Sequence, residues 1–415
     1  MQLSIISCVY FFLTHNIYII KFYREQIWNG ANCITLNRGS SSDDDYRKSN
    51  VLHLYLFGYE LPDTVILLTK DGQCTVLATK KKCEFLEQAM GKEPKDGSVN
   101  KLQLLVKNKA DNNAENLETL LKLAKGESNG EAVKIGLIKK EFKTDTKDGI
   151  VMGWEKKIEE SDSNLEVVDC THGLSLVMAV KEQYELDLLK KSSVLSNKVL
   201  KHSFIKDIED VIENNKTTTH EAIAENLNNV IEDPSKINLK VPQDLVQSCY
   251  FPIIQSGGDY DFKVSAQSNS ENVKFDIITV MLGSRYSNYC SNIGRTLLID
   301  PPKQVQKMYD TLLGVYDAAL KAMVPGKPLK AVYAAAVKYL RDEGKEDLVA
   351  SLPKTLGFSV GLDFRDGNLL LNAKSTVPFK AGMVFNLAVS LSGLTLSDSA
   401  RASANDESAV SGTAC

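Results

Sequence analysis

The stretch that most constrains the fold is 275–300, where two apolar runs flank a polar segment that contains two tyrosines. The first run, 277–282, ends at Gly283, and the second run is 296–299. Two strand-like runs that fold back on each other predict a β-hairpin, and alternation of period two places selected side chains on one face. We therefore expect a hairpin whose first strand is broken at Gly283.

A chain of 415 residues is too long for one compact core and favours two domains, with three as the alternative. Hydrophobic residues make up 43% and charged residues 25% of the chain, which is typical of a soluble protein. The formal net charge is −4, with no strongly basic domain or tail. Bulk charge therefore does not indicate a DNA-binding protein, and we expect no direct sequence-specific DNA binding.

Cysteine and histidine positions limit the chemistry that we expect. Eight cysteines are scattered without a CxxC pair, which argues against a zinc site and a disulfide framework and favours a reducing compartment. None of the five histidines lies beyond His220. The C-terminal half therefore lacks imidazole, the commonest base and metal ligand near neutral pH.

Composition divides the chain into four predicted segments. They are an atypical apolar N-terminus at 1–24, an α/β lobe at 25–176, a second lobe at 177–396 and a disordered Ser-, Ala- and Asp-rich tail at 397–415. The apolar run Leu3–Ile20 is compatible with a transmembrane or signal-anchor segment, but polar residues interrupt it and a basic n-region is missing. A partly buried helix and an atypical start to the chain are the alternatives, and we expect no stable membrane partner.

Local patterns predict the main elements of each lobe. In the first lobe we expect strands at 65–69, 75–79, 101–107 and 134–138, with a hairpin turn at Asp71-Gly72. The second lobe starts with helices, one of them capped by Thr218 and Glu221, and later helices begin after Pro301-Pro302 and near Pro328. The acid-rich stretch 155–169 indicates a solvated face, with a contact for a basic partner as the alternative.

The frame of the 275–300 hairpin resembles the first metal-binding hairpin of the creatinase and aminopeptidase P family. The matching residues are Gly283, Tyr286, Tyr289, Ser291, Arg295 and Thr296. The resemblance implies a mixed α/β and α+β fold class, in which a creatinase N-terminal-like α/β lobe precedes a pita-bread lobe that is incomplete at its C-terminus. In that family, two Asp, one His and two Glu hold two divalent ions that activate water.

The family's ligand positions carry other side chains in this sequence. The two Asp positions correspond to Met281 and Asn292, the His position to Phe358, and the first Glu position to Ala388. The downstream substrate-binding His corresponds to Arg365, another family His to about Val264, and the last Glu lies beyond the end of this chain. A thioether does not replace a carboxylate toward a hard cation, and an amide is a weak ligand. We therefore predict no catalytic residues, no bound metal and no cofactor.

A closer resemblance is to the inactive aminopeptidase-like N-terminal domains in the large subunits of FACT-type histone chaperones. The motifs that carry it are 56–64, 254–258, 289–296, 356–358, 364–367 and 382–386. It implies a nuclear, chromosomal protein that binds histones H3–H4 and reorganises nucleosomes during transcription, replication and repair. It also implies a small HMG-box-type partner subunit, bound through regions absent from this chain.

Two questions stay open at this point. The first is function, because an active metal-dependent Xaa-Pro aminopeptidase or prolidase and a membrane-anchored protein are the alternatives to a non-catalytic chaperone domain. The second is the remnant cleft, where Arg365, Asp363 and Phe358 are candidate peptide-binding residues. The alternative is that Met281, Phe358 and Ala388 only fill the former metal cavity as core.

Overall fold

The computed structural model describes residues 27–40, 46–87, 101–126, 132–144, 149–161, 164–258 and 260–394. The predicted apolar run Leu3–Ile20 and the predicted tail 397–415 lie outside these ranges, so the outer limits of both predicted lobes stay predictions. The chain divides between Met178 and Ala179 into two compact units. Within the described ranges, no helix is both long enough and apolar enough to cross a bilayer.

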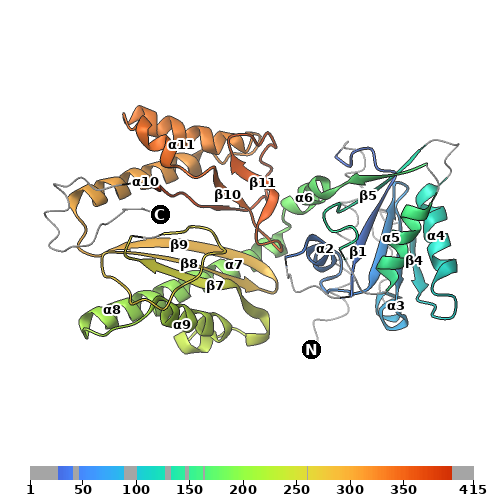
Figure 1. The fold of residues 1–415 in the computed structure, drawn as a ribbon, viewed down its shortest axis with the longest axis horizontal. Helices are drawn as coiled ribbons and strands as arrows, with labels where there is room; N and C mark the ends of the chain where they lie inside the picture. Colours follow the sequence, from blue (N-terminus) through green and yellow to red (C-terminus); the bar gives the residue numbers. More distant parts are fainter. Residues whose placement is uncertain are drawn as a thin grey trace. The chain divides into compact units, whose positions relative to one another are not determined.

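The first unit is built on a six-stranded mixed sheet in the order β4-β3-β2-β1-β5-β6 (Figure 1). The predicted hairpin at Asp71-Gly72 is confirmed, because β2 and β3 pair antiparallel and Gly72 has a φ of 87°. The strands are β1 (Cys33–Arg38), β2 (Thr64–Thr69), β3 (Gln73–Ala78), β4 (Lys101–Val106), β5 (Val133–Leu137) and β6 (Leu165–Asp169). The helices are α2 (Lys48–Phe57), α3 (Lys80–Glu87), α4 (Ala114–Lys125), α5 (Ile150–Glu160) and α6 (Thr171–Ala179).

The acid-rich stretch of this unit is not simply a solvated face. Glu155 on α5 is 4% exposed, and its carboxylate accepts a hydrogen bond from the backbone N–H of Lys143. The same helix buries Trp154 against the sheet, where its indole N–H donates to Thr35 at 3.0 Å. One acidic side chain of this stretch is therefore part of the interior of the unit.

The second unit contains two three-stranded sheets with helices on their outer sides (Figure 1). One antiparallel sheet has the order β7-β8-β9 and the other has the order β11-β10-β12. The strands are β7 (Val246–Ser256), β8 (Ile277–Tyr286), β9 (Tyr289–Leu298), β10 (Thr355–Ser359), β11 (Asp366–Asn372) and β12 (Phe385–Leu387). The α-helices are α7 (Gln183–Val199), α8 (Ile205–Glu213), α9 (His220–Glu232), α10 (Lys303–Lys321) and α11 (Lys330–Asp342).

Strand alternation gives the β8–β9 hairpin two different faces. Directly opposed residues share a face, so the register Leu282↔Ile293 and Gly283↔Asn292 assigns every position of the hairpin. The helix-side face contains Ile278, Val280, Leu282 and Ser284 of β8 with Tyr289, Ser291 and Ile293 of β9. The inner face contains Thr279, Met281 and Gly283 of β8 with Asn292, Gly294 and Thr296 of β9.

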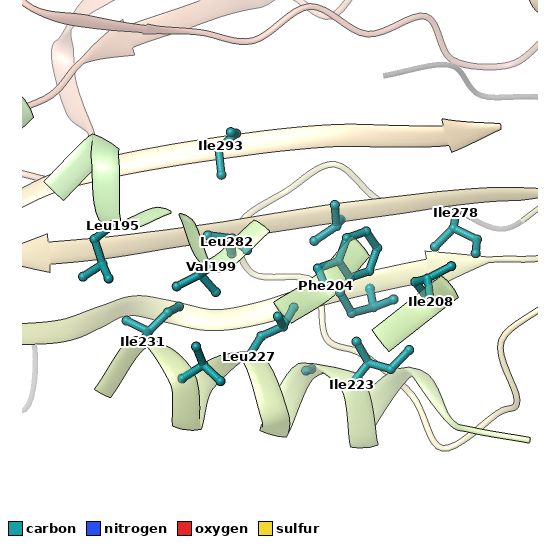
Figure 2. Close-up of a cluster of buried hydrophobic side chains, with 14 of the residues drawn as sticks. Leu195, Val199, Phe204, Ile208, Ile223, Leu227, Ile231, Ile278, Leu282 and Ile293 are labelled. Atoms are coloured by element: carbon teal, nitrogen blue, oxygen red, sulfur yellow. The ribbon is translucent and has the colours of Figure 1, made fainter. Parts of the chain in front are cut away.

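The apolar part of the helix-side face packs on α7, α8 and α9. Figure 2 shows Ile278, Leu282 and Ile293 of the sheet beside Phe204 and Leu227 of the helices. All five are buried, and Phe204 and Leu227 have no exposed surface. This cluster anchors the β7-β8-β9 sheet to its helical layer.

A π-helical turn, η1 (Leu200–Phe204), joins α7 to α8. The buried residues Leu195, Val199, Phe204 and Ile208 follow each other at steps of four, five and four residues (Figure 2). A step of five would rotate Phe204 away from the core in an α-helix, but a π turn holds one extra residue. The π turn therefore keeps the apolar residues on both sides of it directed at the same core.

Two local predictions are wrong. Gly283 does not break its strand, because β8 continues to Tyr286 and the chain reverses at Ser287 and Asn288, which have φ values of 48° and 70°. Gly283 is instead a site of close approach, since a Cβ there would lie 2.7 Å from the backbone oxygen of Ser291. The cap of α9 is Thr219 rather than Thr218, and its hydroxyl accepts from the N–H of Ala222.

Candidate functional site

The inner face of the β8–β9 hairpin carries the first two residues that we predicted at ligand positions. Met281 lies opposite Gly294, and Asn292 lies opposite Gly283, so both side chains project from the same face. Met281 is 9% exposed and also pairs with Ile253 on β7. A thioether at this position fills space beside two strands and offers no negative charge.

Asn292 is held by two neutral partners. The Tyr250 hydroxyl donates a hydrogen bond to the Asn292 side-chain oxygen. The Asn292 amide donates to the Asn386 side-chain oxygen at 3.3 Å, and the Asn386 amide donates to the Asn292 backbone oxygen at 3.2 Å. Burial, followed by the nearby Cys249, raises the pKa of Tyr250 well above its ordinary value, so this phenol is a neutral donor.

Phe358 joins the same cluster from β10. It lies opposite Asn386 in the β10–β12 register and is 8% exposed. Its ring is 5.7 Å from that of Phe364, and the Phe364 ring is 5.3 Å from that of Tyr250. The position that resembles the family's His ligand is therefore filled by an aromatic group with aromatic neighbours.

The remaining predicted residues lie at the margin of this cluster. The guanidinium of Arg365 is exposed and lies 5.5 Å from the centre of the Phe358 ring, a cation–π distance. Asp363 is half-buried and accepts a hydrogen bond from the backbone N–H of Arg365. Ala388 is exposed, so the expectation that it fills the former cavity as core is wrong, whereas Met281 and Phe358 are buried.

The histidine nearest in sequence to the C-terminal half is already engaged. His220, at the start of α9, is 2% exposed. Its Nε2 lies 2.8 Å from the Ser256 hydroxyl and its Nδ1 lies 2.6 Å from the Asn269 side-chain oxygen. Both ring nitrogens thus bind protein partners, which ties α9 to the end of β7 and leaves neither nitrogen for a metal. Val264, predicted at about the position of another family His, is half-buried in the segment between β7 and β8 that also contains Asn269.

These residues do not fit a pair of divalent ions. The four replaced positions supply a thioether, an amide, a benzene ring and a methyl group, none of which is an anionic oxygen ligand. Among the described residues, no three His, Cys, Asp or Glu side chains group together in a way that could hold a metal ion. The neutral hydrogen bonds of Asn292 and the ring contacts of Phe358 occupy this region instead.

Three members of the cluster were not predicted from the sequence as site residues: Tyr250, Phe364 and Asn386. Tyr250 precedes Asn292 by 42 residues, and Asn386 follows it by 94, so only the tertiary fold brings them together. The motifs at 364–367 and 382–386 contain two of them, which is the signal that could have indicated their place.

The fold and the site define a class of protein: a two-unit chain whose second unit has the pita-bread architecture, with uncharged side chains at the predicted ligand positions. Residues 187–404 match the model of metallopeptidase family M24, and residues 13–173 match the SPT16 N-terminal lobe domain of the FACT complex subunit. The X-Pro aminopeptidase of Thermotoga maritima has a similar structure, with a TM-score of 0.60 over 87% of this chain and 88% of that one. Its 16% identity shows a shared fold only.

The chain belongs to the family of N-terminal domains of the FACT complex subunit SPT16. It is similar to that domain from Cicer arietinum, with 32% identity and a TM-score of 0.83 over 94% of this chain and 90% of the other. The corresponding domain from Eremothecium gossypii has 26% identity and a TM-score of 0.80, with 94% and 91% covered. The SPT16 subunit of Zea mays is 35% identical over 89% of this chain, which spans only 35% of that relative's length.

Proposed function

We propose that this chain is a non-catalytic interaction domain of a FACT-type histone chaperone subunit. The observation that supports the proposal is the Tyr250–Asn292–Asn386 hydrogen-bond network, in which only neutral groups surround a residue predicted at a ligand position, in a chain of the SPT16 N-terminal family. A site without anionic ligands does not activate water through two metals. The domain's contribution is therefore binding rather than hydrolysis.

The proposed ligand is histone H3–H4, and the proposed setting is the chromosome in the nucleus during transcription, replication and repair. A small HMG-box-type subunit is the proposed partner through regions outside this chain. Within the chain, Arg365 and Asp363 are the proposed peptide contacts. The Phe358 ring is the third proposed member of this site, and its centre lies 5.5 Å from the Arg365 guanidinium. An exposed arginine on an aromatic ring is a preorganised contact for a backbone carbonyl or a carboxylate.

The test is retention of purified H3–H4 by the full chain at about 0.15 M salt, with metal analysis and Xaa-Pro peptide hydrolysis measured on the same sample. We expect histone retention, no stoichiometric metal and no turnover. Arg365→Ala should weaken retention, whereas Arg341→Ala should not, because Arg341 is exposed and pairs with Glu346 elsewhere in the unit. Stoichiometric metal with chelator-sensitive hydrolysis would instead support the aminopeptidase alternative, and no histone retention would remove the binding proposal.

A further inference from the structure

The outer surface of the α7–η1–α8 helix carries a row of lysines, of which Lys191 lies 5.2 Å from the centre of the Tyr286 ring. Lys191, Lys198 and Lys206 are exposed, and Lys190 and Lys201 flank them. Within the described residues, none of the five forms a salt bridge, whereas Lys216 at the end of the same helical segment pairs with Asp210 at 2.7 Å. The positive charges of the row are thus not neutralised by the protein itself.

The π turn aligns this row as it aligns the core. Lys191 and Lys198 are seven residues apart, which is two turns of an α-helix. Lys198 and Lys206 are eight residues apart, but η1 lies between them and holds one extra residue. The spacing therefore corresponds again to two turns, and the three lysines form a straight stripe over roughly 20 Å, at about 1.5 Å rise per residue.

The surroundings of the stripe leave its potential positive. Partial burial and the charges of Lys198, Lys206 and Lys201 together lower the pKa of the His202 imidazole, so the neutral form is favoured there. Three of the nearby acidic groups have other partners, since Asp187 accepts from Gln183, Asp207 accepts from Asn226 and Asp210 pairs with Lys216. Glu209 is exposed three residues after Lys206, whereas residues 188–206 contain no acidic side chain. The chain's net charge of −4 hides this local accumulation.

The shape and chemistry of the stripe select among anionic partners. A straight row of cations fits a linear polyanion, and duplex DNA presents one charge per about 1.7 Å of its axis. Lysines act as point charges without the bidentate geometry that reads a base, which suits contact with phosphates alone. A membrane-binding helix would carry aromatic or large apolar groups beside its cations. Between Lys191 and Lys198 the exposed apolar side chain is that of Val194, which is small for this purpose, so a membrane surface is the less favoured partner.

We propose that the stripe Lys191–Lys198–Lys206 binds the phosphate backbone of duplex DNA without reading its sequence. This surface is separate from the Arg365 contact proposed for histones, because it lies on the helical layer behind the β7-β8-β9 sheet. It extends the role of the domain to a second, electrostatic ligand. Its binding should therefore depend steeply on salt.

The test compares the full chain with the triple variant Lys191→Gln/Lys198→Gln/Lys206→Gln. Binding to a fluorescent random-sequence duplex is measured by anisotropy between 50 and 200 mM salt, a range chosen because about 0.9 counterions are released per phosphate contact. Three contacts give the wild type a fall in affinity of roughly 40-fold over this range, and the variant should lose that dependence. The control Lys303→Gln/Lys307→Gln/Lys321→Gln removes the same charge from exposed positions on α10. It should keep the wild-type salt dependence of duplex binding.

Two other ligands make the assignment falsifiable. Equal salt dependence in the wild type and in the stripe variant would overturn the proposal. Stripe-dependent binding to phosphatidylserine vesicles or to poly-glutamate that matches or exceeds binding to the duplex would overturn DNA as the ligand. Histone retention is measured separately, and the stripe variant should keep it, so failure of one proposal is distinguishable from failure of the other.

Discussion

The two faces of the β8–β9 hairpin differ in what their side chains do. On the helix-side face, Ile278, Leu282 and Ile293 pack into the core formed with α7, α8 and α9. On the inner face lie Met281 and Asn292, which we predicted at the family's ligand positions, and glycines lie opposite both. The comparison indicates that the packing of the sheet on its helices depends on the helix-side face, so neutral side chains on the inner face are compatible with the scaffold.

The helix-side face is itself divided. Near the β8–β9 turn, the apolar residues give way to hydroxyl groups, where Ser192 and Ser196 of α7 contact Ser284 and Ser291 within hydrogen-bond distance. Small side chains allow the helix to approach the strands closely here, and each hydroxyl has a partner. Further along, the Tyr289 hydroxyl donates to Glu185 at 3.0 Å and lies 2.7 Å from the Tyr184 hydroxyl.

The largest effect should come from truncation on the helix-side face. Phe204→Ala removes a fully buried ring from the position where the π turn returns the chain to the core. We expect a loss of about 3–5 kcal/mol in the free energy of unfolding, measured by urea denaturation. Phe251→Ala is the control, since Phe251 is 50% exposed, and it should stay within about 1 kcal/mol of the wild type. Equal losses in both variants would contradict the assigned core.

A smaller effect is expected for a methyl group added to the inner face. In Gly283→Ala the new Cβ would lie 2.7 Å from the Ser291 backbone oxygen and 3.0 Å from the Tyr250 ring, so a paired strand must shift. The expected cost is about 1–3 kcal/mol. Gly294→Ala adds the same methyl to the same face at 3.6 Å from Met281, an ordinary contact, and should leave thermal stability unchanged or slightly raised. If Gly283→Ala left the thermal stability unchanged, that result would argue against the close approach of the two strands.

The smallest effect concerns pH. Burial raises the pKa of Glu185, against the lowering effect of its hydrogen bond from the Glu182 N–H, so the native state keeps this proton to a higher pH than the unfolded chain. Stability should therefore fall as pH rises from the ordinary carboxyl range, about 4.3, toward the raised value. Glu185→Gln should flatten this part of the profile in denaturation experiments, whereas Asp187→Asn, at an exposed position, should retain it. An unchanged profile in Glu185→Gln would assign the slope to another group.

Sequence patterns predicted elements well where the signal is local. Strands β2 to β5 of the first unit and the helices after Pro301-Pro302 follow from apolar periodicity, turn residues and proline, whereas β1 and β6 were not predicted. The hairpin reversal was misplaced because glycine was interpreted as a turn residue, whereas Gly283 is needed for close packing between strands. The step of five from Val199 to Phe204 was a local signal of the π turn, but it conflicts with helical periodicity unless such a turn is considered.

The site was predictable in its residue types but not in its partners. Met281, Asn292 and Phe358 follow from the matching motifs, yet the Asn292–Asn386 amide contact joins residues 94 apart and depends on how two sheets meet. The exposure of Ala388 also depends on where β12 ends, which is set by tertiary pairing rather than by composition. Long-range pairing of this kind leaves no periodic trace in a single sequence.

The π turn between α7 and α8 also limits how this helix can be wound. If all the residues of Leu200–Phe204 wound as an ordinary α-helix, everything after them would rotate by about 100°, since each residue turns an α-helix by that angle. Ile208 would then leave the interior and Lys206 would leave its row at the same time. The one extra residue in the π turn thus fixes the orientation of the buried face and of the charged face together, and a change in one changes the other.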